Sequence, residues 1–289
     1  MKWTIRSLIK TTTDFLREKV IEEPRLTTEL LLAHALDMKR VSLYLSFDKP
    51  IRKDELSRFR TLVRRRLAHE PVQYIIGNTG FMGLDIGTRK EVFIPRQETE
   101  ILASIVKLWI ESNDLDTFVL YDIGTGTGAI ALFFAHSFSN VKVYVSDISE
   151  RALECARENA KNLSVEARIT FIAGNLLEPF KKAQKANIIV SNPPYIPSAD
   201  IQNLPEIVKR EPHEALDGGE DGLFFIGEII KEAKEYLKPE GLLALEIGNN
   251  QSEQVKELFS KEKVYENITI VPDLRGIKRV VTAILFSYL

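Results

Sequence analysis

Short apolar runs alternate with helical stretches through most of the chain. The run FVLYDIG at residues 118–124 leads into the helical pattern AIALFFAHSF, and KVYVSDI at residues 142–148 leads into ERALECARENAKNL. Further strand-like runs follow: RITFIAG, NIIVSN, LLALEIG, ITIV and RVVTAILF. Such alternation is typical of an α/β fold, because parallel strands need a crossover connection that a helix usually supplies. The sequence therefore predicts a doubly wound, mostly parallel, seven-stranded sheet with helices on both faces.

The first 70 residues show helical periodicity without this alternation. Apolar residues recur at helical spacing up to Leu16 and again after Pro24, where Thr27 and Thr28 are expected to cap a second helix. A third helix is expected from about Lys53 to Ala68. The face of this helix opposite its apolar residues carries Arg58, Arg60, Arg64, Arg65 and Arg66.

The segment PVQYIIGNTGFMGLDIG, residues 71–87, separates the two patterns. It mixes apolar residues with Gly and Asn, and Gly77-Asn78 to Gly80 is expected to form a hairpin turn. The predicted organisation is therefore a small helical domain at residues 1–70, a β-hairpin linker at 71–90 and the sheet domain at 91–289.

Charge is distributed unevenly between these parts. Residues 1–90 carry 18 Lys and Arg against 11 Asp and Glu, whereas residues 91–289 carry 21 against 30. A basic first part and an acidic second part indicate two modules with different partners, although the solvated faces of a small helical domain would give the same balance.

The cysteine, histidine and apolar content argues against disulfides, metal sites and membrane spans. The single cysteine, Cys155, excludes an intrachain disulfide, and the four histidines fit no metal-binding spacing, so no metal is expected. No apolar run approaches the roughly 18 residues that a membrane span needs. Charged residues interrupt the first 20 positions, so they lack the apolar stretch of a signal peptide. We expect a cytoplasmic protein that does not bind membranes.

A glycine-rich turn, DIGTGTG at residues 122–128, lies between a predicted strand and a predicted helix. Glycines at such a place allow a tight turn and the close approach of a ligand. Asp147 ends the next strand, 19 residues beyond Gly128, where it suits a hydrogen bond to ribose hydroxyls. The turn therefore predicts a cofactor that contains a nucleoside. Gly124, Gly126 and Ala129 also satisfy the dinucleotide fingerprint, so the kind of nucleoside cofactor stays open at this point.

The tetrapeptide Asn192-Pro193-Pro194-Tyr195 follows the fourth apolar strand. The two prolines remove two N–H donors, which leaves the Asn192 side-chain oxygen and the Pro193 carbonyl as acceptors. Two fixed acceptors suit the two N–H bonds of an amide or aromatic amino group. Holding both would direct the nitrogen lone pair toward an electrophile, and this chemistry demands neither a metal nor a general base.

These motifs, in this order, resemble class I S-adenosylmethionine-dependent methyltransferases that modify planar amino nitrogens. Four further segments narrow the resemblance to the HemK/PrmC family of release factor glutamine methyltransferases: FIPRQETE (93–100), EPHEALDGGEDGL (211–223), LLALEIGNNQ (242–251) and DLRGIKRVV (273–281). The resemblance covers essentially the whole chain, including a small helical N-terminal domain. It implies S-adenosylmethionine as cofactor, S-adenosylhomocysteine as product, and peptide-chain release factors as partners.

The resemblance also implies site residues. The cofactor-binding set would be Gly124, Thr125, Gly126, Thr127, Gly128, Asp147, Ile148, Asn175, Leu176, Asn192 and Phe93. Asp147 would hold the ribose hydroxyls, and Asn175-Leu176 would flank the adenine. The catalytic set would be Asn192, Pro193, Pro194 and Tyr195, with the substrate amide held by Asn192 and the Pro193 carbonyl.

Two positions depart from the family pattern. The family usually has Pro where Gln97 stands and Asp where Asn175 stands. Asn175 can still accept a hydrogen bond from the adenine amino group, so we expect weaker cofactor binding at most. Gln97 loses backbone rigidity but removes no chemical group.

The implied function is methyl transfer to the side-chain amide nitrogen of the glutamine in the Gly-Gly-Gln motif of release factors, with the helical domain recognising the protein substrate. An alternative is an N6-adenine methyltransferase acting on RNA or DNA, whose arginine-rich helix would grip phosphate. An oxidoreductase has no use for paired acceptors around an amino group. A non-catalytic binding protein would not need the glycine turn, Asp147 and Asn192 together. Direct nucleic-acid binding is therefore not expected.

Overall fold

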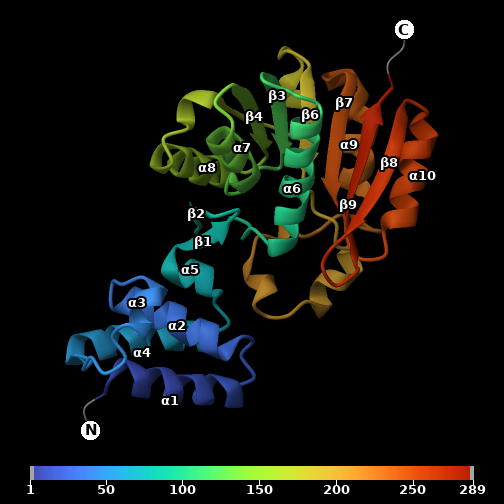
Figure 1. The fold of residues 1–289 in the computed structure, drawn as a ribbon. Coiled ribbons are helices and arrows are strands. Elements are labelled where there is room, and N and C mark those ends of the chain that lie inside the picture. Colours follow the sequence, from blue (N-terminus) through green and yellow to red (C-terminus); the bar gives the residue numbers. More distant parts are fainter. Residues whose placement is uncertain (1–2, 287–289) are drawn as a thin grey trace. The chain divides into compact units, whose positions relative to one another are not determined.

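The computed structural model describes residues 3–286, so the ends of the predicted domains, residues 1–2 and 287–289, lie outside the described residues. The chain forms two compact units (Figure 1). The first holds the residues up to Asn78 together with Pro205–Arg210. The second holds Thr79–Leu204 and the residues from Glu211 onward.

The first unit is helical. Its helices are α1 (Ile5–Glu18), α2 (Pro24–Ala35), α3 (Arg40–Tyr44), α4 (Lys53–Leu67) and α5 (Val72–Ile76). Helices α1 and α4 both pack on α2 around a core that includes Ile5, Leu16, Leu31, Leu32 and Phe59. Thr4 caps α1, because its side chain accepts a hydrogen bond from the Ser7 N–H. The three helices expected from periodicity are therefore present.

Local details of this unit differ from the sequence prediction. Helix α2 begins at Pro24, which suits the first helical position, and Thr27 and Thr28 are buried inside the helix, so the expected capping role is wrong. The short helices α3 and α5 were not expected. Arg66 is buried and is therefore not part of the exposed arginine face that Arg58 and other residues form.

The hairpin turn lies at residues 82–83 and not at the predicted Gly77-Asn78 to Gly80. Gly77, with φ +86°, ends α5, because glycine adopts the left-handed conformation at no steric cost. Strands β1 (Asn78–Phe81) and β2 (Leu84–Gly87) then form a two-stranded sheet around a turn at residues 82–83. The run VQYII, predicted as part of this ribbon, forms α5, because five residues are too few to reveal helical periodicity.

The second unit contains a seven-stranded sheet in the order β5-β4-β3-β6-β7-β9-β8. The strands are β3 (Phe118–Ile123), β4 (Val141–Asp147), β5 (Ile169–Ala173), β6 (Ala186–Ser191), β7 (Leu237–Glu246), β8 (Tyr265–Pro272) and β9 (Lys278–Leu285). Strands β3 to β7 pair in parallel, and β9 is antiparallel to both β7 and β8. The predicted mostly parallel, doubly wound sheet is confirmed.

Helices cover both faces of this sheet (Figure 1). They are α6 (Gln97–Ser112), α7 (Ala129–Ser137), α8 (Glu150–Asn162), α9 (Phe224–Tyr236) and α10 (Ser252–Glu262). Short 3₁₀ segments lie at Glu166–Arg168, Glu178–Phe180, Ser198–Asn203 and His213–Ala215, and one in the first unit at Val208–Arg210. No helix in residues 3–286 is long and apolar enough to cross a membrane.

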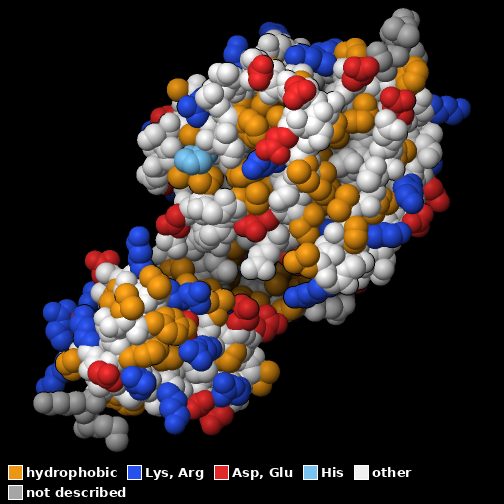
Figure 2. Space-filling view, in the orientation of Figure 1, with side chains coloured by type: hydrophobic (Ala, Val, Ile, Leu, Met, Phe, Trp, Pro, Cys, Tyr) orange, Lys and Arg blue, Asp and Glu red, His pale blue; other side chains and the backbone are white. Residues whose placement is uncertain are grey.

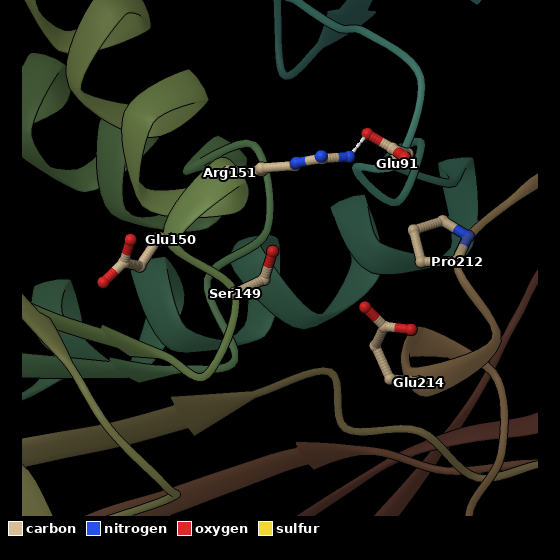
Figure 3. Close-up of a pocket in the computed structure, with 6 residues that line it drawn as sticks. All are labelled: Glu91, Ser149, Glu150, Arg151, Pro212 and Glu214. Carbon is tan, nitrogen blue, oxygen red and sulfur yellow. Dashed lines mark ion pairs between the residues drawn. The ribbon is translucent and has the colours of Figure 1, made fainter.

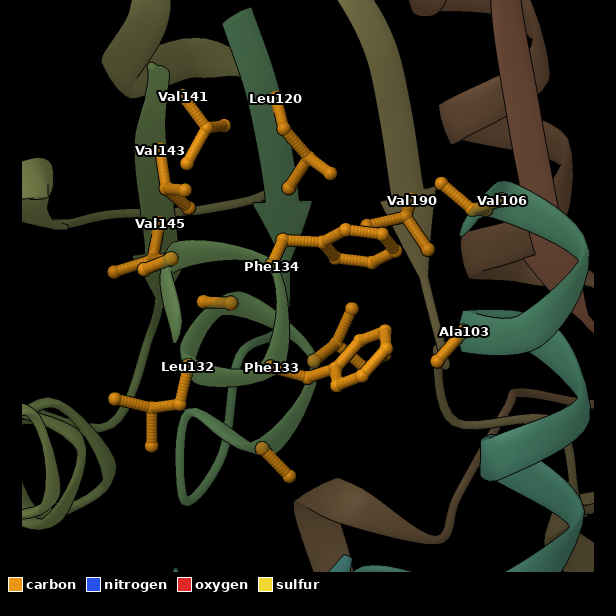
Figure 4. Packing of buried hydrophobic residues seen from close by; sticks show 14 of the residues in the cluster. Ala103, Val106, Leu120, Leu132, Phe133, Phe134, Val141, Val143, Val145 and Val190 are labelled. Atoms are coloured by element: carbon orange, nitrogen blue, oxygen red, sulfur yellow. The ribbon is translucent and has the colours of Figure 1, made fainter. Parts of the chain in front are cut away.

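Alternate side chains of each strand supply the two cores. Leu120 of β3 packs with α6 and α7, where Phe133 and Phe134 lie against the sheet (Figure 4). Tyr121, its neighbour in sequence, belongs to the core with α9 and α10. This period of two explains why the strands read as continuous apolar runs, since both of their faces are buried.

Candidate active site

The carboxyl ends of four neighbouring strands bring the predicted motifs to one edge of the sheet. The glycine turn follows β3, Asp147 ends β4, Asn192 follows β6, and Glu246 ends β7. Strand order reverses between β3 and β6, because β4 and β5 lie on one side and β7 on the other. Ligands of open α/β sheets bind at such a switch point.

The glycine turn leaves open space beside its backbone. Gly124 and Gly126 have φ values of +68° and +58°, and a Cβ atom at either would meet no atom within 4 Å. Gly128 differs, because a Cβ atom there would lie 3.0 Å from that of Ala156 in α8. The first two glycines therefore border a space that a ligand can fill, whereas Gly128 permits close helix packing.

The threonines of the turn point into the protein. Thr125 Oγ1 donates to Asp122 Oδ2 at 2.6 Å, and the Ala131 N–H donates to the same oxygen at 3.2 Å. Thr127 is buried, and its carbonyl accepts from Asn159 Nδ2 at 2.9 Å. Burial raises the pKa of Asp122 to about 7. Asp122 thus holds the glycine turn through these two hydrogen bonds. The sequence prediction did not place this residue in the site. The sequence feature that could have indicated its role is a carboxylate inside a buried strand.

Asp147 holds the same turn from the neighbouring strand. Its Oδ2 accepts from the Gly126 N–H and its Oδ1 from the Ser149 N–H, both at 2.9 Å. Burial raises the pKa of this carboxyl. Each oxygen keeps a further lone pair for a ligand. Ile148, the next residue, is 70% exposed although it is large and apolar.

The predicted residues after β5 lie beside this strand end. Ser146 Oγ donates to the Leu176 carbonyl at 2.8 Å, and Leu176 has a φ of +45°. Asn175 is exposed. The structure thus brings the segment at Asn175-Leu176 to the end of β4, next to Asp147.

An acidic cavity of about 460 Å³ opens beside Ser149. Its lining residues are Glu91, Ser149, Glu150, Arg151, Pro212 and Glu214 (Figure 3). Arg151 forms an ion pair with Glu91, and Glu214 is close enough to Asp147 to raise the pKa of its carboxyl. The net charge of the lining is therefore negative, which suits a cationic ligand.

The Asn192 loop is held from three sides. Asn192 Nδ2 donates to Thr99 Oγ1 at 3.0 Å, and the Tyr195 hydroxyl donates to Glu246 Oε1 at 3.2 Å. Pro193 is buried and Pro194 half-buried. Among the described residues no group donates to Asn192 Oδ1.

Gln251 ties the loop to two other segments. Its Nε2 donates to the carbonyls of Tyr195 at 3.0 Å and Gly222 at 3.2 Å, while its Oε1 accepts from the Gly248 N–H at 2.7 Å. No role is predicted from the sequence for Gln251, although it lies in the segment LLALEIGNNQ. The sequence feature that could have indicated a role is a polar side chain five residues after the end of a buried strand.

Glu246 is a fully buried carboxylate at the end of β7. Burial raises its pKa to about 7, although Thr99, Tyr195 and Arg279 act in the opposite direction. Its Oε2 has no hydrogen-bond partner of ordinary geometry in the part of the chain that the structure describes. Sequence reasoning missed its role, and the available signal is a charged residue within the apolar run LLALEIG.

Phe93 lies on the loop that precedes α6, half-buried, with the Arg96 guanidinium 5.0 Å from the centre of its ring. Gln97, where the family usually has proline, is the first residue of α6 and is exposed. Residues 3–286 contain no group of three or more His, Cys, Asp or Glu side chains that could hold a metal ion.

Comparison with known proteins gives consistent matches to both units. Residues 7–77 match the family described as the PrmC N-terminal domain, and residues 116–282 match a methyltransferase domain. The chain is 43% identical over 280 residues to the release factor glutamine methyltransferase of Geobacter sulfurreducens, covering 96% of each chain. It is 40% identical over 257 residues to that of Moorella thermoacetica, covering 89% of each. A methyltransferase structure from Pyrococcus furiosus shares the fold, with a TM-score of 0.53 and 18% identity over 80% of this chain and 99% of that one.

Proposed function

The chain belongs to the family of release factor glutamine methyltransferases, and we propose that it transfers a methyl group from S-adenosylmethionine to a release factor. The acceptor is the side-chain amide nitrogen of the glutamine in the Gly-Gly-Gln motif. The family resemblance indicated by the sequence motifs is confirmed by this similarity over nearly the full chain. The similarity gives no support to the nucleic-acid alternative.

The observation that carries the proposal is the pair of acceptors beside the glycine turn. Asn192 follows β6 and the turn follows β3, and these strands are neighbours across the switch point. Because Asn192 Nδ2 is engaged by Thr99, its Oδ1 is available for a ligand. The Pro193 carbonyl is the second acceptor, so a primary amide would find a partner for each N–H bond.

The open space along Gly124 and Gly126 fits the methionine part of S-adenosylmethionine. Asp147 has lone pairs for the ribose hydroxyls, and exposed Ile148 offers an apolar surface to a flat ring. Asn175 and Leu176 lie at the same strand end, and Phe93 is assigned to the wall of the site. The acidic cavity favours a positively charged ligand (Figure 3). When bound, this cofactor supplies a methyl group on a positively charged sulfur.

The chain's own contribution to the reaction is orientation. Asn192 Oδ1 and the Pro193 carbonyl would hold both amide hydrogens, which directs the nitrogen lone pair out of that plane. Pro194 presents no N–H that could compete for these acceptors. Tyr195 is anchored at its hydroxyl by Glu246 and at its carbonyl by Gln251, so the loop is preorganised.

The helical unit has the role of recognising the protein substrate in this proposal. None of the assigned cofactor and amide-binding residues lies before residue 90. Many Lys and Arg side chains cover the helices of this unit (Figure 2), and Arg58, Arg60 and Arg64 of α4 are exposed. The residues up to 70 thus form the recognition domain, 71–90 the linker and 91–289 the catalytic domain of a cytoplasmic enzyme.

Mass spectrometry of a purified release factor tests the proposal. After incubation with the protein and methyl-labelled S-adenosylmethionine, the label is expected on the glutamine of the Gly-Gly-Gln peptide. A release factor with that glutamine replaced is the matched control and should stay unlabelled. Label on RNA or DNA instead, with none on the release factor, contradicts the proposal.

A further inference from the structure

A hydroxyl from a distant part of the sequence holds the Asn192 side chain. Thr99 accepts from Asn192 Nδ2 at 3.0 Å although 93 residues separate the two. Thr99 is only 4% exposed and lies in the first turn of α6, where its N–H donates to the Arg96 carbonyl at 3.2 Å. The hydroxyl is therefore carried by the rigid start of a long helix.

Glu246 interacts with the same hydroxyl. The Tyr195 hydroxyl already donates to Glu246 Oε1, whereas Oε2 has no partner of ordinary geometry within residues 3–286. Thr99 lies beside this carboxyl and acts to lower its pKa, and its rotatable hydroxyl proton is one that the unpartnered Oε2 could accept. A buried carboxylate without such donors would be costly, because burial disfavours its charge.

The number of donors and acceptors then decides how Asn192 is oriented. A threonine hydroxyl has one proton to donate and lone pairs with which to accept. When Glu246 is ionised and the proton of Thr99 points to it, the Thr99 hydroxyl can only accept from Asn192. The amide group must therefore turn its Nδ2 toward Thr99 and leave its Oδ1 for a ligand.

We propose that Thr99, backed by Glu246, is a positioning residue that keeps the oxygen of the Asn192 amide facing the substrate. This inference rests on the proposed function, because it concerns how the acceptor amide is held. An Asn192 side chain turned over would present N–H donors to a substrate NH₂ group, and two donors form no hydrogen bond. The same orientation favours a primary amide over a carboxylate, since a carboxylate needs donors.

A pair of substitutions at Thr99 tests this assignment. Thr99→Val removes the hydroxyl and keeps the shape, so kcat should fall about tenfold, the effect of one orienting hydrogen bond. Thr99→Ser keeps the hydroxyl and should retain most of kcat. The affinity for S-adenosylhomocysteine should stay within about twofold in both variants. Thr88→Val is the matched control, because Thr88 is also buried and its hydroxyl has no partner in the described part of the chain.

A measurement on the protein without cofactor makes the test independent of turnover. Nuclear Overhauser effects between the Asn192 side-chain N–H protons and Thr99 are expected in the original protein and in Thr99→Ser. In Thr99→Val they should weaken as the amide samples both orientations. The inference is wrong if Thr99→Val keeps its kcat, or if Thr99→Ser loses as much as Thr99→Val. If the unsubstituted protein fails to methylate the release factor, the proposed function is wrong. The Overhauser data still decide whether the Asn192 amide is hydrogen-bonded to Thr99.

Discussion

Glu211 forms an ion pair with Arg96 although 115 residues separate them in the sequence. The Glu211 side chain is 2% exposed and the Arg96 side chain 31%. Glu211 also accepts from the Ile94 N–H at 3.1 Å, and Arg96 lies over the ring of Phe93. The loop that we assign to one wall of the candidate site is therefore held by a carboxylate from the segment EPHEALDGGEDGL.

Glu211→Gln should loosen this loop. The neutral amide can keep one hydrogen bond but loses its charge, so Arg96 is left partly buried without an anion. We expect the free energy of unfolding in urea to fall by about 1–3 kcal/mol, and proteolysis near Phe93 to become faster. Glu206→Gln is the control, because Glu206 forms an exposed ion pair with Lys209, and this substitution should leave the stability nearly unchanged. Equal stability of both variants would show that the pair does not hold the loop.

Asp147→Ala should weaken cofactor binding more than it weakens the fold. The substitution removes the charged acceptor assigned to the ribose hydroxyls, a loss of roughly 1.5–3 kcal/mol or about ten- to a hundredfold in affinity. Titration calorimetry with S-adenosylhomocysteine measures this directly. Because Asp147 also accepts a hydrogen bond from the Gly126 N–H, the thermal unfolding of the same variant must be measured as well. An unchanged dissociation constant would remove Asp147 from the cofactor site.

Asn192→Ala should abolish most turnover and leave cofactor affinity within a few fold. The lost group is the one that we propose orients the acceptor amide, and comparable preorganised groups contribute ~10²–10³ in rate. The substitution should therefore lower kcat more than it changes KM. Steady-state kinetics with a release factor would separate the two. A near-normal kcat would contradict the two-acceptor arrangement.

The sheet could be predicted from the sequence because its determinants are local. Strands buried on both faces read as apolar runs, and Asn192 follows β6 directly, so its place at the sheet edge needed only the strand assignment. Thr27 and Thr28 were misassigned because Pro24 begins α2 three residues earlier. Threonine is found both at caps and in helix interiors, and only the packing decides between them.

The supporting residues of the site could not be predicted in this way. Thr99 meets the Asn192 loop from 93 residues away, and Glu246 and Gln251 meet it from a second segment more than 50 residues away. No local pattern records such a meeting, which depends on the order of strands in the sheet. Glu246 carries the clearest signal of the three, because a charge inside an apolar strand must have a partner or a shifted pKa.

Glu246→Gln should change how stability depends on pH. The pKa of Glu246 is raised to about 7 from an ordinary value of 4.5, so between these values the folded protein binds a proton that the unfolded chain has lost. The free energy of unfolding therefore falls as pH rises through this window, by on the order of 3 kcal/mol in total. Below pH 4.5 the contribution is fully present, and above about pH 7 it is lost.

The groups around Glu246 define the control for this experiment. Tyr195 hydrogen-bonds to the carboxyl, Thr99 and Arg279 act to lower its pKa, and Glu98 raises it. The pKa of Asp122 is also raised to about 7, so this residue likewise makes the free energy of unfolding fall as pH rises. Urea unfolding at several pH values should therefore show a smaller slope for Glu246→Gln than for the original protein, with a residual slope from Asp122. Identical slopes would mean that Glu246 titrates near its ordinary value.

Charge reversal on α4 tests whether the helical unit recognises the substrate. Arg60 and Arg64 are exposed one turn apart, so Arg60→Glu with Arg64→Glu changes the surface charge without removing buried contacts. If this face attracts an acidic surface of the release factor, KM should rise about tenfold, and the effect should shrink as salt is added. The melting temperature and kcat should stay close to their original values. Lys10→Glu with Lys39→Glu applies the same charge change to exposed positions elsewhere on this unit, and it should raise KM much less. Lower thermal stability with an unchanged KM would instead assign the arginines to packing within the protein.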